Sequence, residues 1–237
     1  MTTHQTALIT GASRGLGKAL AFSLARHNWT LILDARSSET LEQVRAALKK
    51  YTHVITIAGD VTDADHRHAL AIAAETVGGL DLVVNNAGAL GPSPQPELLD
   101  YPLDVLRNVF NTNVIAPLGV LQAVRGHLKD GARVLNISSD AAIEAYAGWG
   151  GYGSSKAALD HLTRIFAAEN PHLHVYSVDP GDMRTQMHQD AFPGEDISDR
   201  PLPQASVPGL LALIEGNLPN GRYAARNLAA TPQETTS

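Results

Sequence analysis

The residues of this chain whose types and spacing best suit a chemical reaction are Ser139, Tyr152 and Lys156. Tyr152 and Lys156 are four residues apart, so on a helix their side chains share one face. An ammonium group beside a phenol favours the phenolate and lowers the phenol pKa, which lets the pair exchange a proton near neutral pH. The hydroxyl of Ser139, just past an apolar strand-like run, can bond a substrate oxygen and stabilise charge that develops on it.

Asn113 is a fourth candidate because Pro117 follows it by four residues in a helix-like stretch. Proline has no N–H and its ring clashes with the carbonyl four residues earlier, so the Asn113 carbonyl is freed from the helical hydrogen bonds. A water bonded to that carbonyl would connect Lys156 to solvent and return protons to Tyr152. The alternative is a proline kink without a chemical role.

A glycine-rich turn lies near the start of the chain, with Gly11, Gly15 and Gly17 between an apolar strand and an amphipathic helix. Glycine permits a tight turn and lets the backbone approach a pyrophosphate. A helix that begins near Gly15 offers unpaired N–H groups and the positive end of its dipole to that anion. A turn that binds nothing is the alternative. Together with the serine, tyrosine and lysine, the turn predicts an enzyme that reduces or oxidises a carbon–oxygen bond.

The end of the second predicted strand bears on the choice between NAD and NADP. A carboxylate there suits a free ribose 2′-hydroxyl, whereas an arginine accepts a 2′-phosphate. Residues 33–37, LDARS, offer both, and Arg14 in the glycine turn adds a second cation. Strand alternation places Asp34 and Arg36 on one face, where they can pair with each other. Two cations and the Ser37 hydroxyl favour NADP, although all of these groups can also be read as solvated surface residues.

Short apolar runs alternate with helix-length amphipathic stretches along the whole chain. This alternation predicts an α/β protein with a Rossmann-type doubly wound parallel sheet, three layers and a single domain over residues 1–237. We expect strands at 7–10, 30–33, 53–57, 80–85, 133–138, 173–178 and 221–224, and helices at 15–27, 39–51, 63–77, 103–127, 154–169 and 202–215. Residues 1–5 and 229–237 are expected to fray.

Composition narrows the class of protein. A net charge of −6 argues against nucleic acid, because phosphate backbones require clustered Lys and Arg. The absence of cysteine excludes disulfides and thiolate metal sites, and the ten histidines show no metal-ligand spacing. The N-terminus does not resemble a signal peptide, and no apolar run reaches the ~18 residues that span a bilayer. We expect a soluble, cytoplasmic protein that binds no metal, no nucleic acid and no membrane.

Taken together, these residues resemble the classical short-chain dehydrogenase/reductase family from residue 6 to about 224. The family's T-G-x-x-x-G-x-G motif matches residues 10–17, its D-V pair Asp60-Val61, its N-N-A-G motif residues 85–88 and its P-G-x-x-x-T motif residues 180–185. The resemblance implies a catalytic tetrad of Asn113, Ser139, Tyr152 and Lys156. It implies that the cofactor is held by Gly11, Ser13, Arg14, Gly15, Leu16, Gly17, Arg36, Ser37, Asp60, Val61, Asn86, Ala87, Gly88, Tyr152, Lys156, Pro180, Gly181 and Thr185.

The resemblance also implies an activity. The expected protein is an NADP(H)-dependent carbonyl reductase acting on CH–OH groups, in which hydride passes between the nicotinamide and a carbonyl or secondary alcohol while Tyr152 acts as acid or base. Alternatives are a non-catalytic NADP(H)-binding redox sensor, an NAD-dependent alcohol dehydrogenase of the same family, and a nucleotide-sugar epimerase or dehydratase. Family members assemble through the helices at 103–127 and 154–169, which implies a homodimer or homotetramer.

Segments 89–97, 140–151 and 183–206 are expected to frame the substrate, and residues 182–206 are expected to form the substrate loop. They carry Tyr146, Trp149, Met183 and Met187, which favour an apolar or aromatic carbonyl compound, unless these side chains merely close a lid. Four glycines in 148–153 predict a pliable loop before Tyr152. The sequence departs from the family where Asp140-Ala141-Ala142 follows Ser139 without the common glycine, and in its short C-terminal part, which leaves substrate and subunit contacts open.

Overall fold

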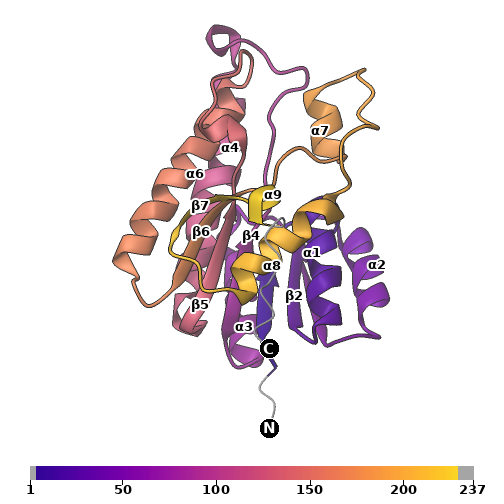
Figure 1. Cartoon of the computed structure of the whole chain (residues 1–237), viewed down its shortest axis with the longest axis vertical. Coiled ribbons are helices and arrows are strands. Elements are labelled where there is room, and N and C mark those ends of the chain that lie inside the picture. Colours follow the sequence, from indigo (N-terminus) through magenta and orange to yellow (C-terminus); the bar gives the residue numbers. More distant parts are fainter. Residues whose placement is uncertain (1–3, 229–237) are drawn as a thin grey trace.

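The structure, a computed structural model, describes residues 4–228. A seven-stranded parallel sheet forms its centre, in the order β3-β2-β1-β4-β5-β6-β7 (Figure 1). The strands are β1 Thr6–Ile9, β2 Thr30–Ala35, β3 Val54–Ala58, β4 Leu80–Asn85, β5 Leu128–Ile137, β6 His174–Asp179 and β7 Gly221–Ala224. The strand order reverses between β1 and β4, which is the switch point where ligands bind in such sheets. The predicted doubly wound fold is confirmed.

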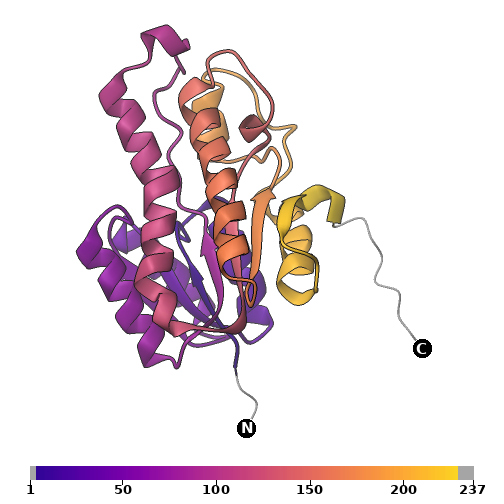
Figure 2. The same ribbon diagram turned by 90° about the vertical axis from the view of Figure 1, so that its left-hand side faces the viewer.

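Helices cover both faces of the sheet, as Figure 2 shows from the side. They are α1 Gly15–Arg26, α2 Ser38–Leu48, α3 Ala64–Thr76, α4 Leu103–Phe110, α5 Ala116–Val124, α6 Gly150–Glu169, α7 Gln186–Ala191, α8 Val207–Glu215 and α9 Ala225–Leu228. The short helices α7 and α9 were not predicted. No helix within residues 4–228 is long and apolar enough to cross a membrane. The predicted frayed ends fall outside the described residues, apart from His4 and Gln5, which precede β1.

Two apolar cores explain the three layers. Successive strand residues point to opposite faces, so Ile9 packs into the core beneath α1, α2 and α8, while Leu8 packs into the core beneath α3, α5 and α6. Both side chains are fully buried. The strands are apolar on both faces for this reason, and the sequence therefore shows continuous runs rather than alternation.

Strand register brings distant motifs together at the carboxyl edge of the sheet. Ile9 lies opposite Leu33 on β2 and Val84 on β4, so the glycine turn after β1 meets the residues that follow both strands. Ile137 lies opposite Val178, which brings Ser139 next to the P-G-x-x-x-T segment. The start of α4 and the whole of α7 project beyond this edge (Figure 1).

The single helix predicted over 103–127 is wrong in detail. A π-helical segment, Asn111–Ile115, separates α4 from α5, and a 3₁₀ turn follows α5. Pro117 cannot donate to the carbonyl of Asn113, and the Ala116 N–H bonds to Asn111 O, five residues back. The proline effect predicted from the sequence is therefore present, but it widens the helix rather than only bending it.

The pliable loop predicted before Tyr152 is also wrong in part, because α6 begins at Gly150, four residues earlier than expected. A Cβ on Gly151 would lie 2.3 Å from the Tyr101 ring, and a Cβ on Gly153 would lie 2.6 Å from Ala141 O. These two glycines allow close packing of the first turn of α6. Gly148 remains in the loop, in the left-handed region at φ +82°.

Candidate active site

The glycine turn is tied to the loop after β4 by side-chain bonds. Thr10 Oγ1 accepts hydrogen bonds from the N–H groups of Asn86 and Ala87, both at 3.0 Å. Asn86 Nδ2 donates to the carbonyls of Thr10 and Gly11 at 2.9 and 3.1 Å. Gly11 has φ +66°, a conformation that L residues with a Cβ rarely adopt. The N-N-A-G motif thus fixes the shape of the turn.

The start of α1 forms a cradle that only glycine permits. A Cβ on Gly17 would lie 2.6 Å from Asn86 Nδ2 and 2.7 Å from Gly11 O. The N-cap residue, Arg14, makes no side-chain cap bond, and the first turn of α1 contains no acidic residue. The N–H groups and positive dipole end of α1 therefore suit an anion, and these residues fit the pyrophosphate of a dinucleotide. Ser13 and Leu16 belong to the same turn, and the Leu16 side chain is buried.

At the end of β2, Asp34 does not pair with Arg36, as strand alternation had allowed. Asp34 is 1% exposed and its Oδ1 lies 2.6 Å from His66 Nε2, whereas Arg36 is exposed. Because β2 ends at Ala35, strand alternation does not extend to Arg36. Burial raises the pKa of the Asp34 carboxyl, and the hydrogen bond that His66 donates to Asp34 raises the pKa of His66.

Two other residues assigned to the cofactor have local structural partners. The Ser37 side chain caps α2 by accepting a hydrogen bond from Thr40 N at 3.4 Å. Asp60 Oδ1 accepts from both the N–H and the hydroxyl of Thr62, and the backbone bond is the main cause of a lowered Asp60 pKa. Val61, the next residue, is buried.

Lys156 and Tyr152 lie on one face of α6, as their spacing predicted. Lys156 is 4% exposed, its Nζ donates to Ile137 O at 2.8 Å, and it lies 5.6 Å from the centre of the Tyr152 ring. Burial lowers the pKa of Lys156 to about 8, and the Asp160 carboxylate opposes that shift. The lysine therefore carries its charge at neutral pH but loses it at moderately alkaline pH.

The predicted lowering of the Tyr152 pKa is wrong for this structure. Burial raises the pKa of the Tyr152 phenol, and the nearby carboxylates of Asp140 and Asp179 raise it further. A hydrogen bond from Ser139 acts in the opposite direction, but the Ser139 hydroxyl donates to Asp140 Oδ1 at 2.8 Å. Because Lys156 is directed to a backbone carbonyl, it does not offset the loss of hydration at the phenol.

Asn113 is fully buried and connects the loop after β4 to α6. Its Oδ1 accepts from Ala89 N at 2.8 Å, and its Nδ2 donates to Ala89 O and to Ser155 Oγ, both at 2.9 Å. A Cβ on Gly88 would lie 3.5 Å from Asn113 Oδ1 and 3.7 Å from Lys156 Nζ. Asn113, Gly88 and Lys156 therefore meet beside the cofactor cradle.

A pocket of roughly 100 Å³ opens at Tyr152 and Ser139. Three of the four predicted substrate residues, Trp149, Met183 and Met187, line it. Tyr146 does not; it is exposed, and its hydroxyl donates to Asp140 Oδ2 at 3.1 Å. The polar part of the wall was not predicted from the sequence; it contains Ser138, Asp140, Asp179, Asp182 and His188. Of these, only Asp140 had a sequence signal, as the residue directly after Ser139.

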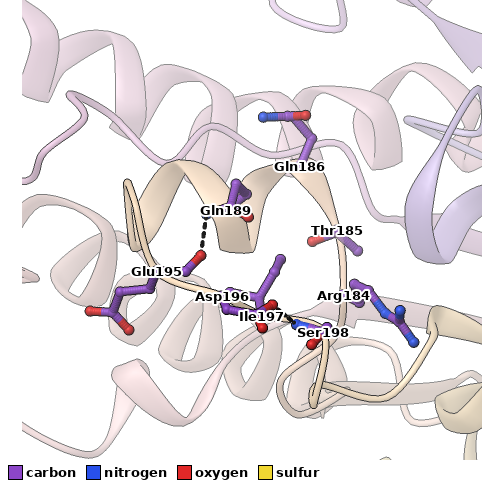
Figure 3. A pocket seen from close by; sticks show the side chains of 8 residues that line it. All are labelled: Arg184, Thr185, Gln186, Gln189, Glu195, Asp196, Ile197 and Ser198. Atoms are coloured by element: carbon purple, nitrogen blue, oxygen red, sulfur yellow. Dashed lines mark hydrogen bonds between the residues drawn. The ribbon is translucent and has the colours of Figure 1, made fainter.

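The predicted substrate loop contains a second, larger pocket of about 390 Å³, lined by residues 184–186, 189 and 195–198 (Figure 3). Gln189 Nε2 donates to Glu195 O at 3.0 Å and closes one side. Thr185 borders both pockets, and its Cγ2 lies 3.7 Å from where a Cβ on Gly15 would be. The P-G-x-x-x-T segment thus returns to the glycine turn, held by a hydrogen bond from Ser206 Oγ to Pro180 O and by Gly181 at φ +74°.

Known proteins resemble this chain over most of its length. The family described as short chain dehydrogenase matches residues 5–196. The hydroxynaphthalene reductase-like protein Arp2 of Metarhizium brunneum is 33% identical over 78% of this chain and 70% of its own length. The short chain dehydrogenase penD of Penicillium thymicola is 34% identical over 95% of this chain and 91% of its own length.

Solved structures share the fold at similar identity. A short chain dehydrogenase from Escherichia coli CFT073, complexed with NADPH, has a TM-score of 0.85 and 29% identity over 94% of this chain and 96% of its own. An alcohol dehydrogenase from Thermococcus sibiricus, complexed with 5-hydroxy-NADP, has a TM-score of 0.85 and 29% identity over 97% and 99%. This chain therefore belongs to the short-chain dehydrogenase/reductase family of NAD(P)-binding oxidoreductases.

Proposed function

We propose that the protein is an NADP(H)-dependent carbonyl reductase with Tyr152 as the proton donor. The observation that carries the proposal is the meeting of Tyr152, Ser139 and an apolar wall at one pocket, close to Gly88 and Lys156 beside the cradle at the start of α1. Arg14 and Arg36 are both exposed at the adenine side and are available for a 2′-phosphate, while Asp34 is sequestered by His66. The relatives complexed with NADPH and with 5-hydroxy-NADP support this preference.

The state of the chain's own groups favours reduction. When bound, the nicotinamide supplies the hydride. Tyr152 has a raised pKa, so at neutral pH it holds the proton that a developing alkoxide needs. Ser139 orients the substrate oxygen once its hydroxyl rotates away from Asp140. Charged Lys156 lies beside Asn113 and Gly88, where it can hold ribose hydroxyls, and Trp149 and Met187 exclude water from the reacting centre.

We infer an aromatic or other apolar ketone as the substrate class. Trp149 packs edge-on against Tyr152, with ring centres 5.9 Å apart, and tilts against Phe192 at 5.7 Å, so an aromatic surface extends away from the phenol. The relatives named hydroxynaphthalene reductase-like agree with such a substrate. The same wall presents His188 and Asp140, which suit a hydroxyl group on the substrate.

The test is a panel of aliphatic and aromatic ketones, including hydroxynaphthalenone-type compounds, with NADPH and NADH oxidation followed in parallel. We expect turnover of at least one aromatic ketone with NADPH and a loss of at least a hundredfold in kcat for Tyr152→Phe. Tyr51→Phe, at an exposed tyrosine that follows α2 and lines neither pocket, is the matched control. Tight NADPH binding without turnover across the panel would instead indicate a redox sensor, and a preference for NADH would indicate an alcohol dehydrogenase.

We also propose that the protein forms a homodimer or homotetramer through the surface made by α4, the π-helical segment and α6. Leu103, Ile115 and Ile165 lie on these elements and are 64%, 55% and 47% exposed. Large apolar side chains that are exposed on neighbouring elements are typical of subunit contacts. Light scattering coupled to gel filtration should give a mass of two or four chains, and Ile115→Asp with Ile165→Asp should reduce it.

A further inference from the structure

Arg222, on the edge strand β7, reaches the backbone of Ser139, which follows β5, two strands away in the sheet. Its Nη2 donates to the backbone carbonyl of Ser139 at 2.8 Å, and its Nε donates to Asp160 Oδ2 at 2.9 Å. The Arg222 side chain is 25% exposed and that of Asp160 is 11% exposed. Two donors of one planar guanidinium are thus committed, which fixes the plane of the group.

Asp160 connects this arginine to the catalytic helix. It follows Lys156 by one turn and Tyr152 by two turns on α6, so the three side chains share a face. Its other oxygen, Oδ1, accepts a hydrogen bond from Ser177 Oγ on β6. The carboxylate is therefore held from two strands and cannot rotate without losing a bond.

The Ser139 backbone needs such an anchor. Ser139 follows the end of β5, and the next residues lead into a largely exposed loop up to Trp149. Apart from the N–H of Ala142, which bonds to it at 3.1 Å, the carbonyl of Ser139 depends on Arg222. A reacting group must be held within about 0.5 Å of its productive position, and a misplacement of about 1 Å costs roughly a hundredfold in rate.

We propose that Arg222 and Asp160 are positioning residues that fix Ser139 relative to Tyr152 through the bridge Ser139–Arg222–Asp160. The inference rests on the carbonyl reductase activity proposed above for the kinetic part of its test. The bridge joins β5, β7 and α6, and it sets the direction in which the Ser139 hydroxyl enters the pocket. Neither residue belongs to a motif that pointed to it from the sequence.

The kinetic test compares Arg222→Met with a matched control. Arg133, on β5, makes the same kind of bond, from Nη2 to Gly216 O at 2.8 Å, but it lies six residues before Ser139, about 20 Å along the strand. We expect Arg222→Met to lower kcat for ketone reduction tenfold to a hundredfold with KM changed less than twofold. Arg133→Met should keep kcat within twofold of the wild type. Arg222→Lys, which has a single ammonium group in place of the planar guanidinium, should have a kcat between those of the wild type and Arg222→Met.

A double-mutant cycle separates positioning from general damage to the fold. If Arg222 acts through Ser139, its substitution has no further effect on kcat in a Ser139→Ala background. A loss of equal size in both backgrounds, or a loss no greater than that of Arg133→Met, overturns the proposal. NADPH affinity, measured by fluorescence, should be the same in all of these variants.

Hydrogen exchange gives a readout that needs no substrate. We expect the amides of residues 139–142 to exchange at least tenfold faster in Arg222→Met and in Asp160→Asn than in the wild type or Arg133→Met. Unchanged exchange in this segment overturns the proposal even where activity falls. Faster exchange together with a wild-type protein that reduces no ketone would leave the bridge established and the proposed function refuted.

Discussion

Asp34 Oδ1 and His66 Nε2 lie 2.6 Å apart, although 32 residues separate them in the chain. Asp34 is the last residue but one of β2 and His66 is in the first turn of α3, and they are 1% and 8% exposed. A Cβ on Gly59 would lie 2.2 Å from the His66 ring, so the glycine before Asp60 gives the imidazole its room. The pair therefore buries the Asp34 carboxylate at the end of β2, where an accessible carboxylate would suit a ribose 2′-hydroxyl.

This pair should make stability depend on pH. Bonding to Asp34 raises the folded-state pKa of His66 above its unfolded value of about 6.5. The stabilisation is thus complete below pH 6.5 and is lost as the pH rises through the folded-state pKa. We expect a lower Tm at pH 8.5 than at pH 6.0 by thermal denaturation. The His66→Gln variant keeps a hydrogen-bond donor but has no titrating group, so its Tm should depend less on pH. In His68→Gln, at an exposed position on the same helix, the dependence of Tm on pH should be unchanged. An unchanged dependence in His66→Gln contradicts the assignment.

The exposed arginines at the adenine side should control cofactor choice. Substituting Arg36 or Arg14 by serine is expected to weaken NADPH binding ten- to a hundredfold and to change NADH binding less than threefold, because a bond to a charged group contributes roughly 1.5–3 kcal/mol. Fluorescence titration measures both affinities. Arg45→Ser is the control, since Arg45 is exposed on α2 and pairs with Glu42. Equal losses for the two cofactors would show that these cations do not distinguish them.

The doubly wound parallel sheet and the position of the motifs at strand ends were predictable because buried parallel strands give apolar runs that a sequence displays directly. The Asp34–His66 pair was not, since strand alternation could be applied to Arg36 only if β2 continued past Ala35, and the strand ends there. The shift of the Tyr152 pKa was predicted in the wrong direction. The spacing shows that Lys156 shares a helix face with Tyr152, but it does not show that the Lys156 ammonium donates its hydrogen bond to the carbonyl of Ile137. Arg222 was missed because long-range bonds to a backbone carbonyl leave no pattern in the sequence.

Gly17 should tolerate no side chain. Its Cβ position lies 2.6 Å from Asn86 Nδ2 and 2.7 Å from Gly11 O, so Gly17→Ala must push the start of α1 away from the turn. Overpacking of this kind costs about 1–3 kcal/mol. We expect a lower Tm in thermal denaturation and NADPH binding weakened at least tenfold. Gly126→Ala is the control, because a Cβ there meets nothing within 4 Å. NADPH affinity equal to that of the wild type in Gly17→Ala would refute the proposal that the start of α1 is the cradle that binds the cofactor.

The pH dependence of catalysis should report Lys156. Burial lowers its pKa to about 8, whereas the phenol of Tyr152 has a raised pKa and stays protonated over the same range. Ketone reduction should therefore decline as the pH rises above about 8, when the lysine loses its charge. Asp160 opposes the effect of burial, so Asp160→Asn should move the decline to lower pH.

Arg222→Met separates this electrostatic effect from positioning, because it removes the bridge to Ser139 and leaves the Asp160 carboxylate in place. Profiles of kcat/KM should be measured between pH 6 and 10. The decline at alkaline pH should begin at a lower pH in Asp160→Asn and at an unchanged pH in Arg222→Met, although both variants are slower than the wild type at pH 7. A decline at the same pH in all three proteins would mean that another group titrates. A decline displaced equally in both variants would mean that the bridge, and not the carboxylate charge, sets the state of Lys156.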